Sequence, residues 1–554
     1  MWAALVFLFH AAFVSSLPLK GADGTVTVRT EDGLLRGQVA TSACNRTYLS
    51  FQAVPFAQPP VGELRFKSPR PAKRWTGVRD ALEEGTYCFQ EDVKSFITKA
   101  NMSEDCLYLN VYIPQTASNN SASGGLPVLV WIYGGAFVIG SGIKDNFGPD
   151  NLMNRTAILV TFNYRVGALG FLSMEHPDVT SNAALKDQVA ALRWVRRNIA
   201  HFGGDPDEVT IFGESAGGIS VDMHLLSPMS EGLFKRAVSQ SGSALAVNFK
   251  PGYNATGEAF RLGAALGYNG TDADELVRFL RSVPAQDILK GQKLVGAEEG
   301  ATATTLIAFP VVDAKTQEGS EVFLPDVPEK LFRAGKVHPV PYITGFNSEE
   351  AKGSFTDVTQ ADLDKYNEEF EQFIPNLLNI EKGTAKSLEI AAKIKSFYFG
   401  NKSISFDMLP QLVNLASDKF MIYAVHRSAM FHLKYGSSPV YMYMFTYDGT
   451  SLLRAGNYTI KGPAHGADVR YLFYPSYENY SPNGDDMKVI QHFTGMWTDF
   501  ALSGDPSRHE SVKWTPATKT SRTYLQIDAD LSLHRDAYKE RMAFWDQVFD
   551  TYKK

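Results

Sequence analysis

The chain has 554 residues, of which 44% are hydrophobic and 21% are charged, a composition that is ordinary for a soluble globular protein. Its formal net charge is −6 at pH 7, which argues against a nucleic-acid partner because such partners require a basic surface. Beyond the N-terminal segment, no apolar run reaches the length of a membrane-spanning helix, so no stable membrane insertion is expected.

The first sixteen residues have the pattern of a signal peptide. Ala3–Val14 is an apolar run too short to span a bilayer, and Val14 and Ser16 satisfy the small-residue rule for cleavage after Ser16. A buried N-terminal helix is the alternative interpretation. A signal peptide at residues 1–16 predicts a secreted, extracellular protein.

Candidate glycosylation sites agree with secretion, because N-linked glycans are added to Asn-x-Ser/Thr in secreted chains. Not every such site needs to carry a glycan. The pattern occurs at Asn45, Asn101, Asn119, Asn154, Asn254, Asn269, Asn401, Asn457 and Asn479.

The cysteine content also suits an oxidising compartment. Three cysteines leave one unpaired. Cys88 and Cys106 are near in sequence, and an oxidising compartment would let them close a short loop, worth about 3 kcal/mol of stability. Cys44 would then be a free, structurally inert thiol; a catalytic cysteine is the alternative.

In chain order, the first predicted elements are short strands. Thr25–Arg36 and Leu49–Val54 are expected to pair in a small N-terminal sheet, and Ser103–Pro114 holds a strand entered from a charged loop. Ser118–Gly125 is expected to be a polar, hairpin-like loop.

After this point, mostly continuous apolar runs alternate with helical stretches such as Ala183–Phe202. The alternation predicts an α/β fold, in which a parallel sheet is covered by helices on both faces and the chemistry lies beyond the carboxyl ends of the strands. Residues 250–335 and 355–435 are expected to be mainly helical and to cap or flank the site. The runs predicted as strands are Val128–Tyr133, Ala157–Asn163, Glu208–Phe212, Arg236–Gln240, Val340–Phe346, Val440–Phe445 and Thr523–Ile527.

The strongest chemical signal is a Gly-x-Ser-x-Gly pattern between a strand and a helix. Val209–Phe212 is a buried strand, Gly213–Gly217 is a sharp turn, and Gly218–Leu226 is expected to be helical. This context is that of a nucleophile elbow, in which flanking glycines leave room beside a strained serine, here Ser215. By itself the pattern is weak, since an ordinary serine in a glycine-rich turn would also produce it.

A serine nucleophile needs a base to accept its proton, and histidine is the usual choice. His426 and His432 fall inside a predicted helix, and His338 precedes a strand and therefore lies at the wrong end. His465 follows the strand Val440–Phe445 in a loop rich in glycine and proline that can rise over the sheet edge. His465 is therefore the predicted base, and a water-exposed loop histidine is the alternative.

The acid that orients the base should lie at another strand end, between the serine and the histidine in the chain. Gly345–Glu350 closes the strand Val340–Phe346 and ends in two glutamates. On spacing alone either Glu349 or Glu350 could serve, and a solvated acidic pair is the alternative.

A tetrahedral intermediate also needs N–H donors for its oxyanion. Trp131–Phe137 leads a strand into a glycine-rich loop whose backbone amides could converge. The candidate donors are Gly135, Ala136 and Ala216, each worth roughly 2.7–4 kcal/mol with suitable geometry. A purely structural strand-to-loop turn is the alternative.

Two longer motifs strengthen these assignments. Phe202–Pro206 leading into Gly213–Gly217 resembles the active-serine signature of the type-B carboxylesterases, and Glu104–Val111 resembles their second signature. The chain is therefore similar to the carboxylesterase/cholinesterase family from about Val26 to Phe549. The resemblance implies an α/β-hydrolase fold, with a central, mostly parallel, twisted sheet and a helical cap region. Residues 17–554 are then expected to form one carboxylesterase domain.

The resemblance also assigns roles. It implies that Ser215 is the nucleophile, His465 the base and Glu350 the acid, because the acid of the family stands three residues after the asparagine that matches Asn347. It further implies a Cys88–Cys106 disulfide and two structural ion pairs, Arg65 with Glu104 and Arg165 with Asp187.

The chain departs from the family pattern at several positions. Ala136 stands where a third glycine is usual, which keeps the N–H donor but adds a methyl group near the acyl site. Ala351 replaces a glycine that often follows the acid. The loop between Cys88 and Cys106 is shorter than in cholinesterases and has no tryptophan to bind a quaternary ammonium, so choline esters are not expected.

The pattern is most similar to secreted and antennal insect esterases that clear dietary, xenobiotic or odorant esters. Juvenile hormone esterases often carry glutamine before the serine, where this chain has Glu214. The spacing of Gly462, His465 and Asp468 nevertheless suits that group, which keeps it as an alternative.

The sequence thus predicts a secreted, glycosylated serine esterase that cleaves small to medium apolar esters through an acyl-enzyme on Ser215. No metal or organic cofactor is implied, the expected partner is a small-molecule ester, and a monomer or weak homodimer is expected. Two rival classes remain: a non-catalytic adhesion protein related to cholinesterases, and a scavenger that is acylated at Ser215 but turns over slowly.

Overall fold

The structure is a computed structural model of the chain. The expected signal peptide at residues 1–16 lies outside the residues it describes, as do most of the loop expected at Ser118–Gly125 and the sequons at Asn119, Asn401, Asn457 and Asn479. None of the helices within its bounds is long and apolar enough to cross a membrane. The described residues are 19–20, 24–91, 101–115, 125–249, 253–298, 308–313, 321–400, 402–449, 453–455, 458–474 and 481–553.

The described strands form one fourteen-stranded sheet and two small strand pairs. Their bounds are β1 (Leu19–Lys20), β2 (Thr25–Arg29), β3 (Leu34–Thr41), β4 (Thr47–Pro55), β5 (Val78–Asp80), β6 (Tyr87–Cys88), β7 (Met102–Ser103), β8 (Tyr108–Pro114), β9 (Leu126–Ile132), β10 (Ile158–Phe162), β11 (Gly204–Glu214), β12 (Arg236–Gln240), β13 (Tyr342–Asn347), β14 (Val440–Phe445), β15 (Leu453–Ala455), β16 (Tyr458–Ile460), β17 (Thr523–Ile527) and β18 (Ser532–Arg535).

The large sheet has the strand order β1-β2-β3-β4-β8-β10-β9-β11-β12-β13-β14-β17-β18, with β5 paired to β3. From β10 to β17 every neighbouring pair is parallel, whereas the strands at both ends are antiparallel apart from β5, which is parallel to β3. The strands of the parallel part are almost wholly buried, which agrees with their continuous apolar sequences. The mostly parallel central sheet is therefore confirmed.

The N-terminal part differs from the expectation in two respects. The strands β2, β3 and β4 belong to the large sheet and do not form a small sheet of their own, because β4 pairs with β8. Thr25–Arg36 was expected as one strand, but it contains the turn of a hairpin between β2 and β3. The amide of Thr30 donates to the carbonyl of Gly33 at 2.9 Å, and Gly33 has a φ of +152°. The turn residues between Thr30 and Gly33 interrupt the alternation that both strands share, which the sequence pattern alone did not reveal.

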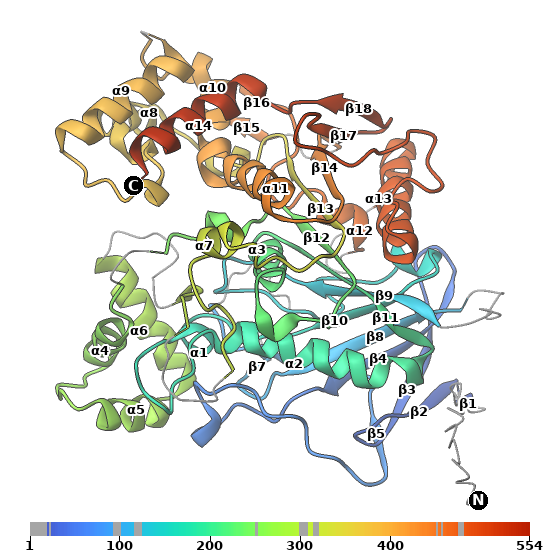
Figure 1. Ribbon diagram of the computed structural model, residues 1–554. Helices are drawn as coiled ribbons and strands as arrows, with labels where there is room; N and C mark the ends of the chain where they lie inside the picture. Colours follow the sequence, from blue (N-terminus) through green and yellow to red (C-terminus); the bar gives the residue numbers. More distant parts are fainter. Residues whose placement is uncertain are drawn as a thin grey trace, which may run out of the picture.

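Helices cover both faces of the sheet, as expected for this class of fold. Figure 1 shows α13 on one side of the parallel strands and α3 and α11 on the other. The helices are α1 (Ala168–Phe171), α2 (Ala183–Asn198), α3 (Ala216–His224), α4 (Ala255–Ala265), α5 (Ala273–Ser282), α6 (Ala285–Glu298), α7 (Pro328–Arg333), α8 (Gln360–Glu368), α9 (Ala385–Phe399), α10 (Leu409–Ser417), α11 (Tyr423–Tyr435), α12 (Val469–Leu472), α13 (Gly484–Ser503) and α14 (Lys539–Tyr552).

The sequence signals at helix ends explain several of these bounds. Asn483 caps α13 by accepting from the amides of its first turn in a capping box, and Gly504 ends the helix with a φ of +78°. Asp272 caps α5, whose apolar side chains Leu276 and Leu280 are fully buried. Polar caps and one apolar face are sufficient to specify such a helix.

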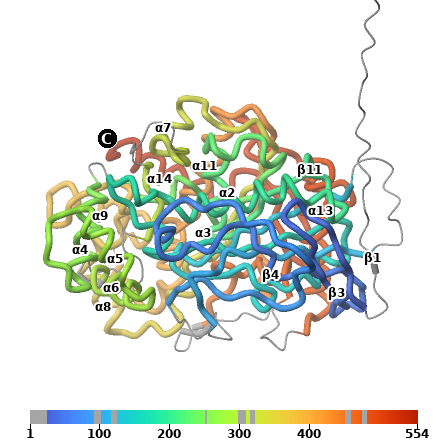
Figure 2. Tube along the Cα trace, turned by 90° about the horizontal axis from the view of Figure 1, so that it is seen from below, coloured from blue at the N-terminus to red at the C-terminus, as the bar shows by residue number. Residues whose placement is uncertain are grey.

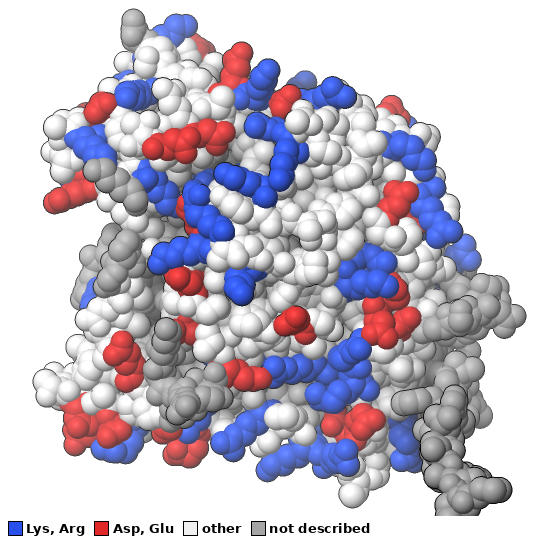
Figure 3. Space-filling view, viewed as in Figure 1, with Lys and Arg blue, Asp and Glu red and all other residues white. Residues whose placement is uncertain are grey.

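Two helical groups flank one end of the sheet. The first comprises α4, α5 and α6, and the second comprises α8, α9 and α10, so the regions predicted to be mainly helical are confirmed as such. Both views of the chain place the two groups at the same end of the molecule, away from the N-terminal strands (Figures 1 and 2). Basic and acidic side chains are interspersed over the face seen in Figure 3.

Several expected links hold the layers together. Cys88 and Cys106 form a disulfide, with Cα atoms 5.0 Å apart, and Cys44 is free and exposed. Both expected ion pairs are present and bidentate: Arg65 with Glu104 at 2.7 and 2.5 Å, and Arg165 with Asp187 at 2.8 and 2.7 Å.

Candidate active site

Ser215 lies at the sharp turn between β11 and α3, as the nucleophile-elbow pattern predicts. Its φ of 55° and ψ of −122° are unusual for a residue other than glycine, and such strain is typical of functional sites. A Cβ atom on Gly217 would lie 1.9 Å from the carbonyl oxygen of Ile132, so this position requires glycine. The helix begins at Ala216, two residues earlier than expected.

The carboxylate of Glu350 holds His465 through one of its two ring nitrogens. Nδ1 of His465 lies 2.6 Å from Oε2 of Glu350, and the backbone amide of His465 donates to the Glu350 carbonyl at 3.1 Å. Glu350 follows β13 and His465 follows β14, so two neighbouring parallel strands deliver the pair to one edge of the sheet. Glu350 is 2% exposed, which keeps water away from this contact.

Two further groups fix the Glu350 carboxylate. The hydroxyl of Ser241 donates to Oε1 at 2.6 Å, and the amide of Asn347 donates to the same oxygen at 2.8 Å. Sequence reasoning missed Ser241, although it directly follows β12 and thus stands at the same sheet edge. Its φ of 45° is unusual for a residue other than glycine.

Glu349, which spacing alone left as the other candidate for the acid, has different surroundings from Glu350. Burial raises its pKa to about 7, while the nearby Arg541 and Lys352 oppose that rise. Within the described residues, the carboxylates in contact with His465 are those of Glu350 and Glu214. The geometry therefore matches the choice of Glu350.

The other ring nitrogen of His465 faces Glu214, the residue before the serine. Nε2 lies 3.2 Å from Oε1 of Glu214, and that oxygen has no aligned hydrogen-bond donor among the described residues. No hydrogen bond joins His465 to the hydroxyl of Ser215 within the described part of the chain. Catalytic hydrogen bonds are often loose without substrate, and a shift of the ring away from Glu214 would be needed to form this one.

The charges around the ring change its proton affinity. Burial lowers the pKa of His465, but the carboxylates of Glu214 and Glu350 outweigh it and raise the pKa to about 9. Burial raises the pKa of Glu214 to about 8, against the opposing effect of His465. Glu214 and His465 therefore share a strong electrostatic interaction beside the serine, which sequence spacing had not indicated.

The glycine-rich turn after β9 lies against the serine. A Cβ atom on Gly134 would be 2.9 Å from Cβ of Ser215, so the turn touches the elbow. Gly135 and Ala136 have φ values of 114° and 52°, and in the described structure their amides donate to no protein acceptor. Ala216 is the first residue of α3, so its amide also lacks an intrahelical acceptor. The turn that carries Gly135 and Ala136 thus lies against the elbow that carries Ala216.

Asp468 forms a second polar layer beneath these groups. Its carboxylate accepts from the side-chain amide of Gln240 at 2.8 Å, from Tyr443 at 3.1 Å and from the side-chain amide of Asn347 at 3.3 Å. Asn347 also donates to the carbonyl of Ala464 in the histidine loop at 2.8 Å. These hydrogen bonds connect the loop that carries His465 to three neighbouring strands and so fix the position of the base.

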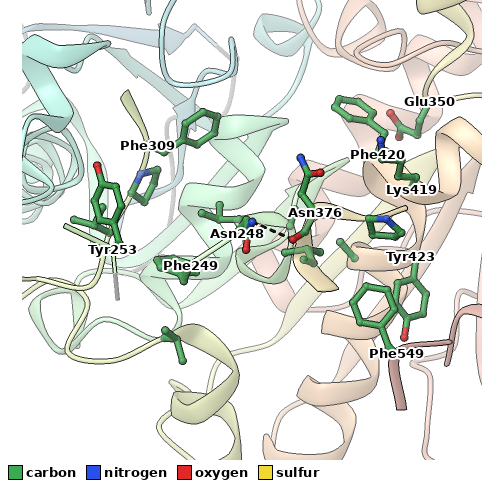
Figure 4. A pocket seen from close by; sticks show the side chains of 18 of the residues that line it. Asn248, Phe249, Tyr253, Phe309, Glu350, Asn376, Lys419, Phe420, Tyr423 and Phe549 are labelled. Carbon is green, nitrogen blue, oxygen red and sulfur yellow. Dashed lines mark hydrogen bonds between the residues drawn. The ribbon is translucent and has the colours of Figure 1, made fainter. Parts of the chain in front are cut away.

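A large cavity opens beside the histidine. Its volume is 1520 Å³, and its wall includes His465 and Glu350 but not Ser215. Figure 4 shows Tyr253 and Phe309 at one end and Phe420 at the other, with Asn248 between them. The cavity is roomy, and aromatic rings line it together with aliphatic and polar residues, as expected of a site for medium-sized organic molecules. Within the described residues, no group of three His, Cys, Asp or Glu side chains is placed to hold a metal ion.

The comparisons with known proteins agree with this arrangement. The profile of the carboxylesterase family matches residues 24–545. A juvenile hormone esterase of Tribolium castaneum is 33% identical over 510 residues, which are 88% of this chain and 85% of that protein. A carboxylic ester hydrolase of Bombus ignitus is 35% identical over 539 residues, which are 94% of each chain.

Solved structures show the same likeness. The crystal structure of the juvenile hormone esterase from Manduca sexta matches with a TM-score of 0.84 at 30% identity, over 95% of this chain and all of that one. The fold is therefore that of the α/β-hydrolases. The chain belongs to the carboxylesterase family, and it is a carboxylic ester hydrolase.

Proposed function

We propose that the chain hydrolyses esters through a covalent acyl-enzyme on Ser215, with His465 as the base and Glu350 as the orienting acid. His465 takes the proton of the Ser215 hydroxyl as its oxygen attacks the ester carbonyl. The amides of Gly135, Ala136 and Ala216 stabilise the oxyanion. His465 then gives the proton to the departing alcohol, and water repeats the sequence to release the acid.

The observation that carries this proposal is the 2.6 Å contact between Nδ1 of His465 and Glu350 beside the elbow. A carboxylate that accepts from Nδ1 fixes the tautomer in which Nε2 is free to act as a base. The contact also stabilises the imidazolium that forms during the attack. Because Nε2 faces Glu214 in the structure, substrate binding has to turn it toward the serine.

The substrates we propose are small to medium apolar esters, including xenobiotic, dietary and odorant or pheromone esters. The aromatic rings in the cavity wall and its 1520 Å³ volume support this class. His465 lies in the wall while Ser215 does not, so the ester carbonyl would enter the elbow from the edge of the cavity beside the histidine.

A juvenile-hormone-type activity is the second candidate. It is supported by the likeness to juvenile hormone esterases of Tribolium castaneum, Heliothis virescens and Manduca sexta. The position of Asp468 beneath the histidine loop gives the Gly-x-x-His-x-x-Asp spacing a structural role. Comparing kcat/KM for juvenile hormone III with that for simple alkyl esters would separate the two candidates.

We also propose a secreted, glycosylated, single-domain protein, mature from residue 17 onward, that is a monomer or weak homodimer. The described sequons support glycosylation because all their asparagines are exposed. Removal of N-glycans from secreted protein, followed by intact-mass measurement, would test both the cleavage site and the glycans. The exposed sequons are Asn45, Asn101, Asn154, Asn254 and Asn269.

The decisive experiment is hydrolysis of p-nitrophenyl acetate by the secreted protein beside its Ser215→Ala variant. Steady turnover that the variant loses would support the proposed mechanism. A burst of one equivalent without further turnover would favour the scavenger instead. Equal turnover by both proteins would exclude Ser215 as the nucleophile.

A further inference from the structure

One end of the cavity is built on an irregular helical turn. Asp418–Ile422 forms a π-helical turn that joins α10 to α11 without a break. Such a turn changes the face that the following side chains present, and π turns occur frequently at functional sites. Here the turn carries three consecutive residues of the cavity wall, Asp418, Lys419 and Phe420.

A buried ion pair anchors this turn. Asp418 is fully buried and accepts from Nε and Nη2 of Arg541 at 2.7 and 2.5 Å and from the hydroxyl of Tyr398 at 2.5 Å. Asp418 belongs to the cavity wall, but its carboxylate is neutralised by Arg541 of α14. The anchor fixes the direction of the neighbouring Lys419 side chain.

Lys419 brings a cation to the cavity without a matching anion. Its ammonium donates to the carbonyl of Gln372 at 2.6 Å, and within the described residues it has no other acceptor and no acidic partner. Burial lowers the pKa of Lys419, and the neighbouring cation Lys382 lowers it further. An ammonium has three N–H donors, so two remain for a ligand.

The other charges at this end of the cavity are already paired. Figure 4 shows Lys419, Phe420, Tyr423 and Phe549 at the same end of the cavity. Glu350 is in contact with His465, and Asp418 is paired with Arg541. The wall at this end includes aromatic rings beside small and aliphatic residues. A chain that is apolar along its length and anionic at its tip would complement both the rings and the ammonium.

We propose that Lys419 makes the enzyme select esters that carry a terminal carboxylate on an aliphatic chain over neutral esters of the same length. The inference rests on the proposed function of Ser215 and His465 and narrows its substrate class. The carboxylate would accept from the two free N–H groups of Lys419, while the chain lies along Phe420 and Tyr423. A charge-assisted hydrogen bond in a partly buried site is stronger than a neutral one, so the preference should be measurable.

The test compares charged and neutral esters of matched length. The charged series is the mono-p-nitrophenyl esters of adipic to sebacic acid, whose carboxylates are too distant to attack their own ester readily, and the neutral series is the p-nitrophenyl alkanoates. A second pair compares acetates of ω-hydroxy acids with alkyl acetates, and their hydrolysis is measured as acid release. This pair places the carboxylate on the alcohol side of the ester. At the best chain length we expect about a tenfold higher kcat/KM for the charged ester, which corresponds to about 1.4 kcal/mol.

Variants assign this preference to the ammonium. Lys419→Met should remove the preference by lowering kcat/KM for charged esters more than for neutral ones, and Lys419→Arg should keep it. Lys519→Met removes an exposed lysine outside the cavity wall and should match the wild type. Retained hydrolysis of neutral esters shows that each variant is folded.

The outcomes separate the two proposals. The inference is overturned if the enzyme turns over neutral esters but shows no Lys419-dependent preference for charged esters, in either series and at any length. The proposed function would still stand. Equal loss of charged and neutral turnover in Lys419→Met also overturns it, because that result indicates a structural role. Turnover that survives Ser215→Ala refutes the proposed function itself.

Discussion

The contact between Glu214 and His465 predicts how the rate of ester hydrolysis depends on pH. The enzyme needs the neutral form of His465, which is lost as the pH falls through its pKa. Because the carboxylates of Glu214 and Glu350 raise that pKa to about 9, the acidic limb of the rate profile should lie above the usual range of histidine. Glu214→Gln removes one of these charges and keeps the size of the side chain.

The size of the effect follows from the short distance. A charge within about 4–6 Å shifts a pKa by about 1–3 units, and Oε1 of Glu214 lies 3.2 Å from Nε2 of His465. We therefore expect the pKa of His465 to fall by at least about one unit in Glu214→Gln. The sign is fixed: loss of an anion weakens proton binding, so the neutral base, and with it the activity, persists to lower pH.

The assay is kcat/KM for p-nitrophenyl acetate across pH 5 to 10, with the acidic limb fitted to one pKa. Glu349→Gln is the matched control, since it removes a buried carboxyl group next to Glu350 that does not contact the ring. The reasoning is refuted if Glu214→Gln leaves the limb unmoved, or if the control moves it equally.

Three further substitutions test other contacts. Ser241→Ala removes the 2.6 Å donor to Glu350, and kcat/KM should fall by roughly tenfold with little loss of stability in a urea titration; an unchanged rate would contradict the role of this donor. Asp222 accepts hydrogen bonds from backbone and side-chain donors at 2.7–2.8 Å. Asp222→Ala leaves these donors buried without an acceptor, and should lower the free energy of unfolding by about 3 kcal/mol. Replacing both Cys88 and Cys106 by alanine should also lower the free energy of unfolding by about 3 kcal/mol, since their separation of 18 residues sets the entropy of the loop that the disulfide closes. An unchanged urea midpoint would contradict this prediction.

Local chemistry explains what the sequence determined by itself. Continuous apolar runs were sufficient to locate the central strands, and those predicted at Arg236–Gln240, Val440–Phe445 and Thr523–Ile527 have the observed bounds. The nucleophile elbow was also readable, because a serine turn between glycines has one compact geometry. In a parallel sheet all strand ends of one kind meet at one edge, so order along the chain was enough to select His465 and a glutamate after β13.

Tertiary packing decided the remaining features, because each depends on residues that are remote in sequence. Ser241 reaches Glu350 only because β12 and β13 are neighbours in the sheet. The ring of His465 meets Glu214 across a gap of 251 residues, so no local pattern could show that the base faces an acid. Lys419 belongs to an ordinary helical sequence, and its place in the cavity follows from the π turn and from Asp418, which is anchored on α14. Periodicity records which side chains are buried, but the direction of a charge inside a cavity is set by the partners that packing brings to it.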